Sequence, residues 1–241
     1  MNGISVAIAT HQDRIKWYIH IIRKLYDVVD EFIVLEDNPT DLIFNKAEEV
    51  LKGMSKVSHL RSQDLGLNVI QGPFKNKLQA VALCINEYVA VLDSDNEFGV
   101  KYIEAFKKAA LQTMPGNTVY CPVKALPRFD FSAYKGQVFS KNNAGYFMKD
   151  GPFQVLMNTG NYIVKKKQYF GILEQLFCEK IPHCCDVVYA NYHILKAGGT
   201  MCVVDGMKYG HLDHPGSTYR QNVDKEPEET LKWQNMVRTL K

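Results

Sequence analysis

Long hydrophobic runs are missing from this sequence of 241 residues. No apolar stretch reaches the roughly 18 residues that a membrane-spanning helix needs, so we expect no transmembrane segment. Two glycine-rich phosphate-binding patterns, GxxxxGK[S/T] and GxGxxG, are also absent. Their absence excludes a P-loop NTPase and an ordinary dinucleotide-binding dehydrogenase. With only 9 prolines and 16 glycines, the chain is not fibrous or of low complexity either.

A strong excess of one charge is missing as well. The 29 basic and 26 acidic residues leave a net charge of +3, and no long basic block occurs, so we expect no nucleic-acid partner. The densest basic runs are Lys107-Lys108 and Lys165-Lys166-Lys167. We interpret them as solvated helix faces, and a peripheral contact with an anionic membrane surface stays open as the alternative.

Paired cysteine motifs are missing too, because the six cysteines are scattered and form no CxxC. Several of them lie inside apolar segments, as buried free thiols do. The first residues, Met1 to Ser5, carry no basic group, so we expect no signal peptide. Together these features predict reduced thiols and a cytoplasmic protein. The cysteines are Cys84, Cys121, Cys178, Cys184, Cys185 and Cys202.

What is present is a regular alternation of strand-like and helix-like segments in a chain that is 46% hydrophobic. Short apolar runs alternate with stretches whose apolar residues recur every three or four positions. This order predicts an α/β fold with an open, mostly parallel twisted sheet flanked by helices. We expect strands over 4–9, 31–36, 57–60, 67–70 and 88–92, and helices over 13–28, 41–52 (capped by Thr40 or Asp41) and 75–87.

The second half of the sequence is less regular. Residues 127–153 are rich in aromatic, glycine and polar residues and resemble a long loop, in which we expect most aromatic rings to pack. No linker divides the chain, so we expect one domain over 1–241. The remaining predictions are strands over 161–165 and 201–204, and helices over 167–178, 185–197 and 226–240, the second of them closed by Gly198-Gly199.

Polar residues follow three of the predicted strands directly. They are Thr10 to Arg14, Glu36 to Asn38, and Asp93 to Asn96. If the strands are parallel, their carboxyl ends lie at one edge of the sheet, which is where open α/β sheets bind ligands. We therefore expect the three clusters to meet there.

The Asp93-Ser94-Asp95 motif is the most informative of these clusters. Two carboxylates two positions apart on an extended segment face the same side, where they repel each other unless a cation lies between them. Hard oxygen ligands suit Mg²⁺ or Mn²⁺. A cation held by so few carboxylates completes its shell with phosphate oxygens and water, so the motif predicts a nucleoside diphosphate as ligand.

The ordered set of motifs resembles the glycosyltransferases of the GT-A fold, and among them the family 2 type. One departure is that Cys185-Asp186 stands where that type usually has Glu-Asp. The motifs that carry the resemblance are Ala9-Thr10-His11-Gln12-Asp13-Arg14, Glu36-Asp37-Asn38, Asn76-Lys77-Leu78-Gln79-Ala80, Tyr88 to Asp95, Met157-Asn158-Thr159-Gly160-Asn161-Tyr162, Asp186 to Gly198, and His211 to Ser217.

The resemblance implies a role for each matching residue. Asp93 and Asp95 would hold Mn²⁺ or Mg²⁺, with His214 as a third ligand and His211 as its alternative. Asp186 would be the general base that deprotonates an acceptor hydroxyl, and a single displacement would invert the anomeric carbon. The residues implied to contact the donor are Thr10, His11, Arg14, Asp37, Asn76, Lys77, Asp93 and Ser94.

The resemblance also implies a division of labour along the chain. Residues 1–98 would bind a UDP- or GDP-linked sugar, residues 99–218 would bind a carbohydrate or glycan acceptor, and residues 219–241 would form a helical tail. The predicted function is metal-dependent transfer of a hexosyl or pentosyl group in carbohydrate biosynthesis. Two alternatives stay open: a non-catalytic relative that binds nucleotides or carbohydrates, and a sugar-nucleotide pyrophosphorylase.

Overall fold

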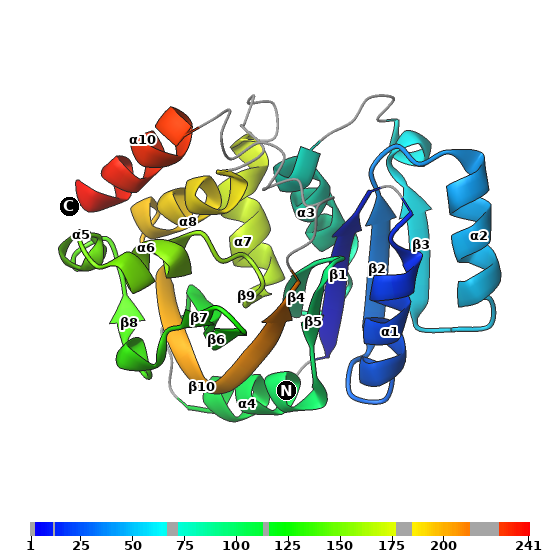
Figure 1. Cartoon of the computed structure of the whole chain (residues 1–241), viewed down its shortest axis with the longest axis horizontal. Coiled ribbons are helices and arrows are strands. Elements are labelled where there is room, and N and C mark those ends of the chain that lie inside the picture. Colours follow the sequence, from blue (N-terminus) through cyan, green and yellow to red (C-terminus); the bar gives the residue numbers. More distant parts are fainter. Residues whose placement is uncertain (1–2, 12, 67–71, 113–115, 177–184, 213–226) are drawn as a thin grey trace.

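The computed structural model describes the chain except for residues 1–2, 12, 67–71, 113–115, 177–184 and 213–226. The described strands form one ten-stranded sheet, and helices cover both of its sides (Figure 1). The strand order is β3-β2-β1-β4-β9-β6-β10-β5, with β7 beside β6 and β8 beside β10. The open and mostly parallel α/β sheet predicted from the sequence is confirmed.

The first four strands are parallel and in the expected places. The apolar residues of β1, β2 and β4 are buried on both faces, which explains why these runs are nearly continuous rather than alternating, whereas β3 at the sheet edge is only half-buried. The strand predicted over 67–70 lies outside the described residues. The strands are β1 (Ile4–Thr10), β2 (Glu31–Glu36), β3 (Val57–Arg61) and β4 (Tyr88–Asp93), and the intervening helices are α1 (Ile15–Leu25), α2 (Asp41–Leu51) and α3 (Gly72–Leu83).

The second part of the sheet mixes strand directions. The short strand β9 (Ile163–Lys165) runs antiparallel between β4 and β6 (Thr118–Leu126). The long strand β10 (Thr200–His211) is parallel to β6 and antiparallel to β5 (Asn96–Phe98). The register of β10 shifts between Val204 and Lys208, where Gly206 has a φ of 86° that favours glycine. This bulge lets one strand continue well past the predicted 201–204.

Helices of the second part lie on opposite sides of the sheet (Figure 1). Helix α4 (Val100–Ala110) packs against β10, whereas α7 (Lys166–Leu173) and α8 (Asp186–Lys196) contact each other and α3. The last helix, α10 (Pro227–Arg238), packs against α8 through Trp233, whose ring lies 4.5 Å from that of Tyr189. Because α8 begins at Asp186, this packing holds the helix that carries the predicted base.

The prediction of a long loop over 127–153 is wrong. The segment folds into short pieces around an aromatic cluster in which the rings of Phe139 and Phe153 lie 4.6 Å apart. The expectation that most of its rings pack is confirmed, and Tyr146 is the exception at 82% exposure. The pieces are β7 (Phe129–Asp130), a 3₁₀ turn (Ser132–Tyr134), β8 (Val138–Phe139), α5 (Ala144–Phe147) and α6 (Gly151–Met157).

Several smaller predictions can be compared with the structure. The Thr40 hydroxyl accepts a hydrogen bond from the Ile43 amide and caps α2, as one of the two expected caps. Cys84, Cys121 and Cys202 are buried free thiols, as expected, Cys185 is buried as well, and the other two cysteines lie outside the described residues. No described helix is both long and apolar enough to cross a bilayer.

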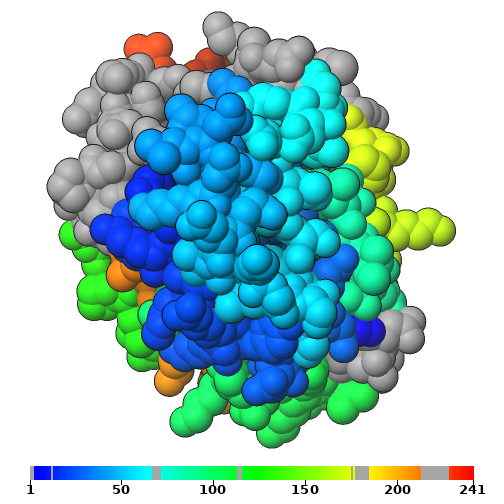
Figure 2. Space-filling model, turned by 90° about the vertical axis from the view of Figure 1, so that its right-hand side faces the viewer, coloured from blue at the N-terminus to red at the C-terminus, as the bar shows by residue number. Residues whose placement is uncertain are grey.

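On the side of the molecule beyond β3, the surface is formed by helices and strands of the first half of the chain. Figure 2 views the molecule from this side, and its blue to cyan surface belongs to α1, α2 and β3.

Two lysines of the basic runs form hydrogen bonds within the protein: Lys107 donates to the Val28 carbonyl at 3.2 Å, and Lys166 donates to the Cys84 carbonyl.

Candidate functional site

Three parallel strands end at the same level and bring the predicted polar clusters together. Ala9 of β1 pairs with Asp93 of β4, and Thr10 pairs with Glu36 of β2. Asn76, from α3, donates to the carbonyls of Thr10 and Leu35 at 3.2 Å each. The buried Asn76 amide therefore joins the ends of β1 and β2. Asn76 was predicted to bind the sugar donor, and in the structure its amide nitrogen bonds to the protein backbone.

Asp95 is paired with a cation from the loop that follows β1. The Arg14 guanidinium donates to Asp95 Oδ2 at 2.8 Å, and both side chains are largely buried. His11 lies beside the same guanidinium, with its Nε2 3.3 Å from Arg14 Nη2. The structure thus brings three predicted site residues into contact across 81 positions of sequence.

Asp93 is joined to the predicted base by one lysine. The Lys77 ammonium lies 2.7 Å from Asp93 Oδ1 and 3.0 Å from Asp186 Oδ2. Its side chain is only 8% exposed, and that of Asp186 is 12% exposed. Residues from α3, from the end of β4 and from the first turn of α8 therefore form a single charged cluster.

Burial and charge act against each other in this cluster. Burial opposes the charge of Lys77, but attraction by Asp186 and Asp93 outweighs it and raises the lysine pKa. Burial also opposes ionisation of Asp93, yet Lys77 and Arg14 lower its pKa. For Asp186, burial and repulsion from Asp93 outweigh the attraction of Lys77 and raise its pKa. A carboxylate with a raised pKa is a stronger base, as proton abstraction requires.

Other predicted donor residues surround the cluster. Asp37 Oδ2 accepts a hydrogen bond from the Gly72 amide at 3.0 Å, at the start of α3. The hydroxyls of Thr10 and Ser94 are buried and find no hydrogen-bond partner within the described part of the chain. Ser94 is fully buried, so among these residues it is the least accessible to a donor.

Glu36 plays a different part from its neighbour Asp37. It lies inside the protein, where Tyr18 donates to Glu36 Oε1 at 3.0 Å and His59 Nε2 lies 3.1 Å from the same oxygen. Of the two acids at the end of β2, Asp37 is therefore the one that contacts α3 and the polar edge. Sequence alone did not separate these roles.

The two candidate histidine ligands have different outcomes. His214 lies outside the described residues. His211 ends β10 directly opposite Asn96, the residue after Asp95, and the Asn96 side chain accepts a hydrogen bond from the Leu212 amide at 3.2 Å. The buried His211 Nδ1 has no hydrogen-bond partner among the residues described. The prediction that a histidine completes the site remains untested.

The carboxylate oxygens at this site are ligands of the kind that a divalent cation prefers, but they are too few to complete its coordination shell. Asp93 and Asp95 supply hard carboxylate oxygens, the type that Mg²⁺ and Mn²⁺ prefer. No group of three or more His, Cys, Asp or Glu side chains in the described residues is arranged to hold a metal. A cation held by Asp93 and Asp95 would therefore need further ligands from phosphate, from water or from the undescribed residues.

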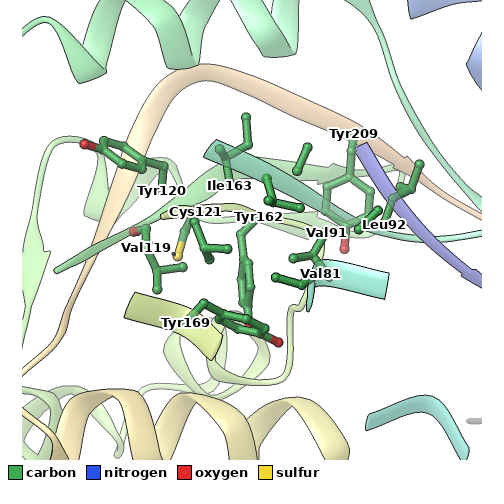
Figure 3. Close-up of a cluster of buried hydrophobic side chains, with 14 of the residues drawn as sticks. Val81, Val91, Leu92, Val119, Tyr120, Cys121, Tyr162, Ile163, Tyr169 and Tyr209 are labelled. Carbon is green, nitrogen blue, oxygen red and sulfur yellow. Dashed lines mark hydrogen bonds between the residues drawn. The ribbon is translucent and has the colours of Figure 1, made fainter. Parts of the chain in front are cut away.

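Beside Asp186 and Lys77 there is a small pocket with aromatic walls. Phe74, Tyr162 and Tyr169 line it together with Gly160 and Val187. Tyr162 directly precedes β9, and Figure 3 shows its ring pointing toward Tyr169. Burial raises the pKa of Tyr169 to about 12, so its hydroxyl is neutral at physiological pH. The pocket places apolar and hydroxyl-bearing surface next to the predicted base.

Sequence analysis missed one residue of the site. Asn161 lies within a motif that we quoted, but we assigned it no role. Its side chain contacts both the backbone and the carboxylate of Asp93. An asparagine at the first position of a predicted strand was the available signal, and it is weak because asparagine is common at strand and turn boundaries.

Comparison with known proteins finds solved structures of similar fold. No protein-family model matches the chain, and no curated protein matches it. The structure of S. aureus TarS 1–349 in complex with UDP-GlcNAc has a TM-score of 0.67 at 14% identity, covering 98% of this chain and 65% of that one. Mannosyltransferase PcManGT from Pyrobaculum calidifontis, in complex with GDP-Man and Mn²⁺, gives a TM-score of 0.61 at 12% identity, covering 97% and 63%.

The chain has the GT-A fold. It spans 65% of TarS 1–349 and 42% of another TarS structure, to which its TM-score is 0.61. In this GT-A sheet the charged cluster lies beyond the carboxyl ends of β1, β2 and β4, the usual ligand position in open α/β sheets.

Proposed function

We propose that this GT-A protein transfers a sugar from a nucleoside-diphosphate sugar to a hydroxyl of a carbohydrate acceptor. The single observation that carries the proposal is the cluster of Asp93, Asp95 and Asp186 with Lys77 and Arg14. Three carboxylates and two cations converge at one sheet edge from four separate segments. Burying ion pairs costs desolvation energy that their mutual attraction only partly offsets, so a cluster of this kind contributes little to stability and favours a functional role.

The donor diphosphate has suitable partners in this cluster. Arg14 and Lys77 are cations that can turn from Asp95 and Asp93 to phosphate oxygens, to which guanidinium and ammonium groups bind well. Thr10 and Asp37 lie at the adjoining strand ends and can contact the nucleoside. The UDP-GlcNAc and GDP-Man complexes of the structural neighbours support a UDP- or GDP-linked donor.

Metal dependence is part of the proposal. Asp93 and Asp95 would hold Mn²⁺ or Mg²⁺, with His214 as a further ligand, because His211 forms no three-ligand group with the two aspartates among the described residues. When bound, the cation supplies Lewis-acid stabilisation of the departing diphosphate. The Mn²⁺ in the PcManGT complex supports this choice of metal.

Asp186 is the proposed general base. Its carboxylate accepts the proton of the acceptor hydroxyl while the acceptor oxygen bonds to the anomeric carbon. The bond from that carbon to the diphosphate oxygen breaks in the same step, and the nucleoside diphosphate leaves. One displacement of this kind inverts the anomeric centre. Lys77 keeps the Asp186 carboxylate directed toward the donor side, 3.0 Å from its ammonium.

The aromatic pocket beside Asp186 is the proposed start of the acceptor site. Phe74 and Tyr162 offer ring surface, on which sugar faces can pack. We also propose a cytoplasmic location, which the buried free thiols of Cys84, Cys121 and Cys202 support because oxidising compartments favour disulfides.

A donor panel tests the function. The protein is incubated with UDP- and GDP-sugars, with Mn²⁺ or with EDTA, and release of the nucleoside diphosphate is measured. We expect release from one class of donor with Mn²⁺ and a large loss with EDTA. Asp95→Asn should abolish donor use, whereas the control Asp64→Asn, at a side chain 56% exposed, should not.

The outcomes also separate the alternatives. Absence of both binding and release for every donor would contradict the proposal. Tight donor binding without any transfer would favour a non-catalytic relative. Formation of a nucleotide sugar from a sugar phosphate and a nucleoside triphosphate would favour a pyrophosphorylase.

A further inference from the structure

Asn161 holds Asp93 from two sides. Its Oδ1 accepts a hydrogen bond from the Asp93 amide at 3.0 Å, and its Nδ2 donates to Asp93 Oδ2 at 3.3 Å. One side chain thereby contacts both the backbone and the carboxylate of the same residue. The other carboxylate oxygen, Oδ1, is left facing Lys77 and the polar edge.

Asn161 is itself fixed by buried groups from two other elements. The Tyr102 hydroxyl, on α4, donates to the Asn161 carbonyl at 2.7 Å. Burial raises the pKa of Tyr209, on β10, and the side chains of Asn161 and Thr159 interact with its hydroxyl and act against that shift. Asn161 is 3% exposed, and Tyr102 is fully buried.

The adjoining backbone completes this arrangement. The Val91 amide of β4 donates to the Tyr162 carbonyl at 2.9 Å. Figure 3 shows Tyr209 beside Val91 and Leu92, the two residues that precede Asp93. Buried hydrogen bonds of this kind are short of alternative partners, so they keep a side chain in one orientation.

We propose that Asn161 is the positioning residue that orients Asp93 toward the donor diphosphate and its cation, so that the acceptor half sets the geometry of the donor site. The inference rests on the proposed function. It assigns to Asn161 the presentation of Asp93 Oδ1, with Oδ2 retained inside the protein by Asn161. Residues that orient metal-binding carboxylates strongly influence metal affinity.

The test compares two asparagines that are equally buried. Asn161→Ala removes the contact with Asp93. Asn191→Ala is the matched control, because the Asn191 side chain is fully buried and donates to the Met157 carbonyl at 2.7 Å. Calorimetry measures binding of Mn²⁺ in the presence of UDP or GDP, and amide hydrogen exchange measures protection of the Asp93 N–H.

The expected results follow from the two contacts. Asn161→Ala should weaken Mn²⁺–nucleotide binding by about tenfold or more. It should also speed exchange of the Asp93 amide by about fivefold or more. Asn191→Ala should leave both measurements within about twofold of the wild-type protein. Equal losses in the two variants, or unchanged values in Asn161→Ala, would overturn the positioning role.

The exchange measurement separates failure of this inference from failure of the function. If the wild-type protein binds neither nucleotide, the proposed function fails, while faster Asp93 exchange in Asn161→Ala still supports the positioning role and unchanged exchange overturns it. If Asn161→Ala does not fold, Tyr209→Phe replaces it. That variant removes one hydroxyl from Asn161 and should shift both measurements in the same direction by a smaller factor; no shift would overturn the inference.

Discussion

The two halves of the sheet contribute to the charged cluster in different ways. In the first half, Asp93 and Asp95 lie at or just after the end of the parallel strand β4, and Asp95 takes its partner Arg14 from the loop after β1. Lys77 reaches the same edge from α3. The second half contributes Asn161 and Asp186, which come from a turn before an antiparallel strand and from the start of a helix. Asp93 and Lys77 each contact residues of both halves.

Under the proposed function, this difference divides donor binding from transfer between the two halves of the sheet. The parallel edge can hold an anionic ligand with residues that are local to each strand end. The second half has to reach that edge through long-range contacts: Lys77 and Asp186 are 109 positions apart, and Asp93 and Asn161 are 68 apart. Substitutions on either side should therefore separate donor binding from transfer.

The largest expected effect is on transfer, through Asp186→Asn. Loss of the proposed general base should lower the turnover rate by about 10²- to 10⁴-fold, while donor affinity stays within about twofold. Steady-state kinetics and calorimetry with the donor measure the two quantities. The control Asp205→Asn, at an exposed acid paired with Lys135, should leave both unchanged. Equal loss of affinity and rate would show that Asp186 belongs to the donor side.

The next largest effect should come from Lys77→Met, which removes the link between the halves. Asp93 and Asp186 would then lie buried without their shared cation, at a cost of about 3–5 kcal/mol in the free energy of unfolding. Because the pKa of Lys77 is raised, its contribution is fully present at neutral pH and is lost only under strongly alkaline conditions. Urea unfolding at pH 7 measures it.

Lys135→Met is the matched control for that variant. Its ammonium pairs with Asp205 at the surface, where both side chains are more than half exposed. Such a pair contributes about 0–1 kcal/mol, so this variant should unfold much like the wild-type protein. Similar losses in the free energy of unfolding of the two variants would mean that the buried cluster stabilises the protein no more than a surface ion pair does.

Gly160→Ala should have a smaller effect, confined to the acceptor side. An added Cβ would lie 2.7 Å from Val187 Cγ2, so the first turn of α8, which carries Asp186, would have to shift. We expect a loss of about 1–3 kcal/mol in stability and a lower transfer rate with little change in donor affinity. Gly171→Ala, which meets nothing within 4 Å, is the control and should not destabilise.

The smallest effect concerns pH. Because burial and repulsion from Asp93 raise the pKa of Asp186, the rate should fall with decreasing pH at a higher pH than an ordinary aspartate would give. In Lys77→Met the cation that favours the charged carboxylate is gone, so the acid limb of kcat/KM should move to still higher pH. A limb that stays in place or moves down would contradict this assignment of the base.

Sequence patterns predicted the first half of the fold well for a physical reason. Strands buried on both faces, such as β1 and β4, leave continuous apolar runs, and amphipathic helices such as α1 leave a clear spacing. Strand β6 contains Pro122 and Lys124 and β10 contains Asp205 and Lys208, so their patterns are interrupted. The segment 127–153 folds around contacts among its own aromatic rings, whose spacing follows neither the helix nor the strand period.

The candidate site could be predicted only in part. Motif order placed Asp93, Asp95, Lys77 and Asp186 among the functional residues, and the fold brings them together. The partners could not be predicted, because contacts such as Arg14 with Asp95 and Asn161 with Asp93 depend on strand order and register. The inward direction of Glu36 likewise depends on Tyr18 and His59 packing behind β2.

A crystal structure with UDP or GDP and Mn²⁺ tests the central claim most directly. We predict anomalous density for Mn²⁺ at Asp95 and Asp93, with the diphosphate contacting Lys77 or Arg14 at the ends of β1 and β4. Nucleotide bound elsewhere on the molecule, or Mn²⁺ density away from both aspartates while they keep their pairs with Lys77 and Arg14, would contradict the account.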